Sequence, residues 1–202
     1  MTGLRISPSD ALPLDAAEVL LTLGCPVPAH TAELLDAAAA GIARARALAE
    51  PKTLWRLFPL SWEDGHPSLA GAALPLSGSD IAGHLAGSTH CLVTASTLGL
   101  ATERELLRLS TLPAEALYFD AACSLMIEAA ADEAEATILP TLPAHDDPTF
   151  RYAPGYGDLP LSIQAPLLAV LDAPRKIGLT LTATGLMLPR KSITGFVGIR
   201  VK

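Results

Sequence analysis

An alanine-rich segment between Pro113 and Pro140 constrains the fold of this chain more than any other stretch. Its interior contains neither proline nor glycine, and alanine has the highest intrinsic helix propensity. Pro113 suits the first turn of a helix, because the N–H that proline lacks has no intrahelical acceptor there. The sequence therefore predicts one long helix over residues 113–139, within a chain of 202 residues that suits a single domain.

The segments before this helix predict a mixture of helices and strands. Asp15 is a suitable N-cap and Gly24 a suitable stop, and Thr102 followed by Glu105 has the spacing of a capping box. We expect helices over residues 14–24 and 30–50, at Ser79–Leu85 with Ser79 and Asp80 as caps, and after Thr102; we expect strands over residues 53–60, 70–76 and 90–99. Residues 1–50 are thus expected to form a helical part and residues 51–202 an α+β body.

Residues 140–160 differ in composition from the rest of the chain. They contain five prolines and two glycines, and we expect one long ordered loop, a type of segment that is often functional. A helix over residues 161–175 and strands over residues 179–184 and 192–201 are expected to follow. Helices and strands do not alternate as β-α-β units, so the predicted fold class is α+β, with a central antiparallel or mixed sheet flanked by helices.

Charge and cysteine content exclude several classes of protein. The formal net charge is −7 and no basic stripe is present, which argues against nucleic acid and anionic membrane as partners. No apolar run is long enough for a transmembrane helix, and no secretory signal is recognisable. The three cysteines form no CxxC pair, so we expect buried thiols in a cytoplasmic protein.

Searches for common catalytic and metal motifs find none. The sequence lacks a P-loop, a GxGxxG loop after a strand, HExxH and GxSxG. Its five histidines are scattered, and no two are four residues apart. We therefore predict no catalytic residue and no metal site in this chain.

The octapeptide RYAPGYGD at residues 151–158 is the most informative local motif. Its proline-glycine pair predicts a tight turn close to the cation of Arg151. A guanidinium can bind a carboxylate bidentately, while turn backbone and the Tyr156 ring can hold a neighbouring polar or aromatic group. The motif therefore suits a small zwitterion. In the alternative interpretation the loop is only structural, and Arg151 pairs with Asp146, Asp147 or Asp158.

This motif and MLPRKSITG at residues 187–195 together resemble the activation domain of cobalamin-dependent methionine synthase. That domain has an R-x-x-P-G-Y loop followed by a strand-like LTE segment and M-x-P-x-x-S-V-S-G, and residues 179–183 here are LTLTA. The resemblance implies a C-shaped α+β domain with a central antiparallel sheet that binds S-adenosylmethionine. It also implies a role in reductive reactivation, in which the sulfonium methyl group is presented to reduced cobalt and a flavodoxin-type reductant supplies the electron.

The resemblance also implies roles for individual residues of this sequence. Arg151 matches the arginine that binds the ligand carboxylate, and Glu128 stands where the family has an acidic helix residue near the ligand. The adenosine part of the ligand is expected to lie along Ala153, Pro154, Gly155 and Tyr156. Ser192 and Gly195 match the last motif, for which strand geometry and packing are the alternative role.

The sequence differs from methionine synthase in ways that change the implied role. GDLPL follows Tyr156, as in free-standing members of the family, and Ala183 replaces a glutamate. A later tyrosine-bearing segment has no counterpart. The chain contains no D-x-H-x-x-G cobalamin motif, no zinc-thiolate set and no folate module. The resemblance therefore implies an accessory protein that meets cobalamin only through a separate corrinoid protein, such as a methionine synthase core.

Three functions remain open at this point. The first is the separate reactivation subunit. The second is a non-catalytic binding or assembly module of the same fold with a degenerate ligand site. The third, a methyltransferase for another substrate, is disfavoured because no glycine-rich loop follows a first strand. The high apolar content predicts an exposed apolar patch that docks the partner, and self-association through that patch is compatible with the sequence.

Overall fold

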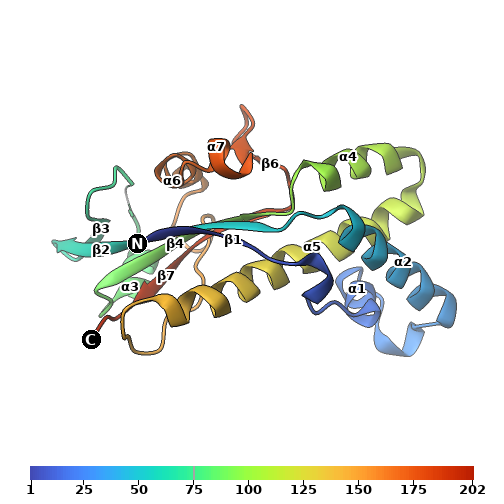
Figure 1. Ribbon diagram of the computed structural model, residues 1–202, viewed down its shortest axis with the longest axis horizontal. Coiled ribbons are helices and arrows are strands. Elements are labelled where there is room, and N and C mark those ends of the chain that lie inside the picture. The colour runs from blue at the N-terminus through green and yellow to red at the C-terminus, as the bar shows by residue number, and fades with distance from the viewer. Residues whose placement is uncertain (75) are drawn as a thin grey trace.

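The computed structural model describes residues 1–74 and 76–202 and consists of an antiparallel sheet with helices on both faces (Figure 1). The strands are β1 (Thr2–Ile6), β2 (Lys52–Glu63), β3 (His66–Leu69), β4 (His90–Thr97), β5 (Thr180–Leu181), β6 (Met187–Leu188) and β7 (Ser192–Ile199). The helices are α1 (Ala16–Thr22), α2 (Ala32–Leu48), α3 (Ser79–Leu85), α4 (Leu100–Arg108), α5 (Pro113–Ile138), α6 (Gln164–Leu171) and α7 (Ala173–Ile177).

The main sheet has the order β1-β2-β4-β7, and β3 pairs with the far end of β2. All of these pairings are antiparallel. Strand β4 lies between two neighbours and is buried from Cys91 to Thr97, as the continuous apolar and small-residue composition of residues 90–99 predicts. Strands β5 and β6 form a separate two-stranded hairpin. The predicted α+β class with a central antiparallel sheet is confirmed.

Helix α5 lies along one face of the sheet, and α6 and α7 lie on the other (Figure 1). Because neighbouring strand residues point to opposite faces, Leu57 and Val197 pack toward the end of α5, while Phe58 and Phe196 pack in the core beneath α6. The two faces are therefore separate cores divided by the sheet.

A third core joins α1, α2 and α4 to the first half of α5. Small residues allow α2 and α5 to approach closely. A Cβ atom on Gly41 would lie 2.9 Å from the backbone carbonyl of Tyr118, so a larger residue there would separate the two helices. The alanine-rich composition thus provides both the helix propensity of α5 and its close packing.

Several local predictions are confirmed. The segment 113–139 is α5, and residues 14–24 contain α1 with the Asp15 carboxylate accepting a hydrogen bond from the Ala17 N–H. The helix expected over residues 30–50 is α2, capped by Thr31. Cys91 and Cys123 are buried and Cys25 is partly buried. Burial raises the thiol pKa of both buried cysteines to about 12, so their thiolates are scarce at neutral pH.

The strand predictions near β2 were wrong in two places. Strand β1 was not predicted, because its alternating half-buried and exposed residues include apolar side chains on the exposed positions. The returning strand is His66–Leu69, and Gly71, with a positive φ of 75°, follows its end. Residues 70–74 and 76 of the expected strand are not in a strand, and residue 75 lies outside the described residues. The first fifty residues therefore contribute a sheet strand as well as helices.

Three helix and strand boundaries also differ from expectation. The helix expected over residues 161–175 is interrupted at Asp172, whose left-handed backbone separates α6 from α7. Only Thr180–Leu181 of the expected strand 179–184 is paired. The capping box at Thr102 is absent, because Gly99 is the N-cap of α4 and the buried Thr102 hydroxyl donates back to the Gly99 carbonyl.

Within the described part of the chain, no helix combines the length and hydropathy needed to span a bilayer.

Candidate ligand site

The proline-rich loop of residues 140–160 runs along the outer edge of β7. The N–H of Tyr152 donates to the Phe196 carbonyl at 2.9 Å, and the N–H of Phe196 donates to the Tyr152 carbonyl at 2.9 Å. Nearer the C-terminus of β7, the N–H of Thr149 donates to the Gly198 carbonyl at 3.1 Å. These backbone bonds hold Arg151 at a defined position on the sheet edge.

The segment Ala153–Tyr156 forms the tight turn that its proline-glycine pair predicts. The N–H of Tyr156 donates to the Ala153 carbonyl at 3.2 Å, and Gly155 adopts a φ of 94°, a conformation that glycine reaches without strain. Pro154 is buried, Ala153 is half-buried, and Tyr156 is 59% exposed. The turn therefore presents the tyrosine side chain to solvent.

The side chain of Arg151 passes over Gly195 on its way to α5. A Cβ atom on Gly195 would lie 2.3 Å from Cγ of Arg151, closer than any two such atoms can approach. The missing side chain of Gly195 thus leaves room for the arginine. Ser192, the other matched residue of the last motif, donates its hydroxyl to the Pro189 carbonyl at 2.8 Å, which is a strand-entry contact.

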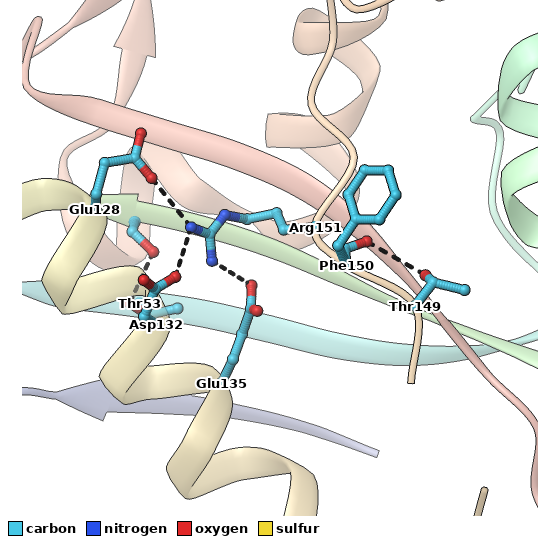
Figure 2. Close-up of polar contacts among 8 residues, drawn as sticks. Thr53, Glu128, Asp132, Glu135, Thr149, Phe150 and Arg151 are labelled. Atoms are coloured by element: carbon cyan, nitrogen blue, oxygen red, sulfur yellow. Dashed lines mark hydrogen bonds and ion pairs between the residues drawn. The ribbon is translucent and has the colours of Figure 1, made fainter. Parts of the chain in front are cut away.

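Three carboxylates on one face of α5 surround the Arg151 guanidinium (Figure 2). Nη1 donates to Glu135 at 2.6 Å, whereas Nη2 donates to Asp132 at 2.9 Å and to Glu128 at 3.1 Å. The spacings of four and three residues place all three acids on the same side of the helix. Arg151 and Glu135 are 11% and 17% exposed, while Glu128 and Asp132 are 57% and 70% exposed.

The cluster contains more negative than positive charge. One guanidinium faces three carboxylates, a formal surplus of two negative charges. Burial alone would lower the pKa of Arg151, but the carboxylates of Glu135 and Asp132 outweigh it and raise that pKa above its usual value. Burial raises the pKa of Glu135 despite its contact with Arg151, and repulsion from the other two acids adds to the rise.

The structural alternative for Arg151 named the wrong partners. Arg151 contacts neither Asp146 nor Asp147, and Asp158 binds the start of α3 instead. Glu128 lies beside Arg151, and the ligand contact that the resemblance implies for it stays a prediction. Asp132 and Glu135 were missed, although their i+4 and i+7 spacing from Glu128 could have indicated a shared helix face.

Metal ligation has no obvious location in this structure. Among residues 1–74 and 76–202, no three histidine, cysteine, aspartate or glutamate side chains are grouped so that they could hold a metal ion. The α5 acids are already bridged by a cation of the chain itself. The cluster is thus a mixed-charge site that suits an ionic organic ligand better than a metal.

Comparison with known proteins gives one line of evidence. No family model and no curated protein matches the sequence. A solved structure described as "Crystal Structure of the MetH Reactivation Domain bound to AdoHcy" matches with a TM-score of 0.71 at 14% identity, over 98% of this chain and 78% of that one. The activation-domain-like architecture implied by the two motifs is thereby confirmed, and the chain has the fold of the MetH reactivation domain.

Proposed function

We propose that this protein binds S-adenosylmethionine and acts as a separate reactivation subunit for a cobalamin-dependent methyltransferase of the methionine synthase type. The observation that supports this most strongly is the coincidence of fold and motif. The likeness extends over 98% of the chain, and the R-x-x-P-G-Y loop lies ordered on the edge of β7 with Arg151 facing α5. The neighbour's bound AdoHcy is the demethylated form of the proposed ligand.

The charge balance of the cluster is compatible with this ligand. S-adenosylmethionine contains one carboxylate together with an ammonium and a sulfonium. Arg151 would bind the carboxylate bidentately, and the surplus acidic groups would attract the two cations. Glu128 and Asp132 are exposed enough to rotate away from Nη2, whereas the half-buried Glu135 holds Nη1 and keeps the guanidinium in place.

Aromatic and apolar side chains flank the loop and would serve the adenosine part and the docking face. The ring of Tyr156 meets that of Tyr152 edge-on, with centroids 5.9 Å apart. Phe150 and Leu161 are 70% and 61% exposed, so both present apolar surface beside the loop. In this proposal a corrinoid protein would cover these two side chains.

The role of this chain would be to position the ligand, while the ligand and the cobalamin of the partner protein would carry out the methyl transfer. Bound S-adenosylmethionine would supply the methyl group, and cobalamin would belong to the partner protein, with a flavodoxin-type reductant as electron donor. Arg151 would orient the amino-acid end, and the turn at Ala153–Tyr156 would set the direction of the adenosine.

A non-catalytic module of the same fold is the second candidate. It is favoured by the pairing of both terminal nitrogens of Arg151 with acids of α5. A guanidinium used only to tie the loop to α5 would have the same contacts. The two candidates differ in whether a ligand can compete with Glu128 and Asp132.

Calorimetric titration of S-adenosylmethionine distinguishes them. We expect saturable binding to the wild-type protein and a loss of about 2–4 kcal/mol of binding free energy in Arg151→Ala, the size of a charge-assisted bidentate contact. Arg5→Ala is the matched control, because Arg5 also pairs with an acid of α5 but lies on β1. Arg151→Lys, which retains the charge but not the bidentate geometry, is a second variant to test in case the alanine variant does not fold. Absence of binding to the wild-type protein at millimolar ligand would favour the second candidate.

A further inference from the structure

The end of the ligand loop is tied to a helix that is distant in the sequence. The Asp158 carboxylate accepts hydrogen bonds from the N–H of Ser79 at 2.6 Å, from its hydroxyl at 2.8 Å, and from the N–H of Asp80 at 3.2 Å. In return the Asp80 carboxylate accepts one from the N–H of Asp158 at 3.1 Å. The expected caps of α3 are therefore replaced by a cap from the loop, and the contact is reciprocal.

Two glycines make this contact sterically feasible. A Cβ atom on Gly78 would lie 2.3 Å from a carboxylate oxygen of Asp158, and one on Gly157 would lie 2.1 Å from a carboxylate oxygen of Asp80. Both glycines adopt positive φ, 139° and 51°, a region that other residues rarely occupy. The GD pair that follows Tyr156 thus has a defined structural use in this chain.

The same contact restrains the backbone between Arg151 and Leu159. The Tyr152 hydroxyl donates to the Tyr156 carbonyl at 3.1 Å, and the N–H of Leu159 donates to the same carbonyl at 3.0 Å. The N–H of Gly155 donates to the Leu159 carbonyl at 2.8 Å. The loop is therefore attached to β7 through Tyr152 and to α3 through Asp158, and the turn at Ala153–Tyr156 lies between these two attachment points.

We propose that Asp158 is a positioning residue for ligand binding, which acts by anchoring the loop to α3 and thereby fixing the turn and the Tyr156 side chain. This inference rests on the proposed function, since it assigns the turn to the ligand. In this proposal Asp158 acts through the loop and does not itself touch the ligand. Its hydrogen bonds from Ser79 and Asp80 also lower its pKa, so the carboxylate remains ionised over the neutral range.

The test compares Asp158→Ala with Asp15→Ala. Asp15 is also a helix-capping carboxylate, with a 3.0 Å bond from the Ala17 N–H, but it caps α1 away from the loop. We expect Asp158→Ala to speed amide hydrogen exchange at Gly155 and Leu159 about tenfold and to weaken S-adenosylmethionine binding about tenfold. Asp15→Ala should change neither, and Asp158→Asn, which keeps one acceptor oxygen, should recover part of both.

Other outcomes would overturn the inference. If Asp158→Ala lowers global stability as Asp15→Ala does, but leaves loop exchange and ligand affinity at wild-type values, then Asp158 is only a helix cap. Faster loop exchange with unchanged affinity would show that the anchor does not position the ligand. If the wild-type protein binds no S-adenosylmethionine, the proposed function fails separately, and the exchange experiment still decides whether Asp158 orders the loop.

Discussion

Arg5 and Arg151 reach α5 from opposite edges of the main sheet, and their surroundings differ in charge. Arg5 on β1 pairs with a single carboxylate, Glu133, which also accepts hydrogen bonds from Ser7 and Thr137. Arg151, beside β7, faces three carboxylates. Among the described residues, no hydroxyl group donates a side-chain hydrogen bond to these three acids. One edge therefore has a neutral ion pair, and the other has an acidic surplus around a partly buried cation.

The difference suggests how the two edges are used. A neutral pair with its oxygens satisfied by hydroxyl groups needs nothing further, which is typical of a structural tie. A surplus of two negative charges is unfavourable for folding by itself, and it becomes favourable when a cationic ligand binds. The comparison thus supports the proposal that a ligand binds at the β7 edge, where Arg151 also compensates a half-buried acid, whereas the β1 edge has only a structural ion pair; the experiments below test this contrast.

The largest expected effect is on stability. Removing Arg151 leaves the half-buried Glu135 carboxylate without its cation, beside two further acids. Since an uncompensated buried charge is costly, we expect Arg151→Ala to lower the free energy of unfolding by about 2–4 kcal/mol. Arg5→Ala, which breaks a more exposed pair, should cost about 0.5–1 kcal/mol. Urea unfolding measures both, and equal losses would remove the distinction between the edges.

A smaller effect is expected on ligand selectivity. S-adenosylmethionine has a sulfonium charge that S-adenosylhomocysteine lacks, so the acidic surplus should favour the former. Asp132→Asn removes one exposed charge of the cluster, and we expect the affinity ratio of the two ligands to fall about two- to fivefold at low ionic strength.

Asp120→Asn is the matched control for this selectivity. Asp120 is an acid of the same helix that pairs with Lys191 and not with Arg151, so its neutralisation should leave the ratio unchanged. An equal fall in both variants would indicate a general charge effect of α5 and not a property of the cluster.

The smallest expected effect is a difference in pH dependence. Hydrogen bonding with Arg5 lowers the pKa of Glu133, so its contribution to stability is present above its ordinary pKa and is lost on acidification. Burial raises the pKa of Glu135, so its contribution is present at low pH and is lost as the pH rises through the raised value.

Unfolding of Glu133→Gln and Glu135→Gln between about pH 4 and pH 7 tests this difference. As the pH rises, wild-type stability relative to Glu133→Gln should increase, whereas relative to Glu135→Gln it should decrease. Slopes of the same sign would contradict the contrast between the two edges.

The parts of the fold that could be predicted from sequence are those decided by local preferences. Alanine content and Pro113 predict α5, Asp15 predicts the start of α1, and the proline-glycine pair predicts the turn at residues 153–156. Strand β1 escaped prediction because it is paired on one side only and its pattern lacks a clear apolar face. The break at Asp172 was missed although Pro174 lies in the first turn of α7, a position where proline commonly begins a helix.

The features of the candidate site likewise separate into those predictable from local sequence and those that depend on tertiary packing. The motif residues, the turn and the single-face spacing of Glu128, Asp132 and Glu135 can all be read from the sequence alone. The contact of Arg151 with these acids across Gly195, and the capping by Asp158 of a helix that begins 79 residues earlier, depend on the packing of distant segments. Backbone preferences act over a few neighbouring residues, whereas the partner of a charged side chain depends on strand register and helix packing, which bring distant segments together.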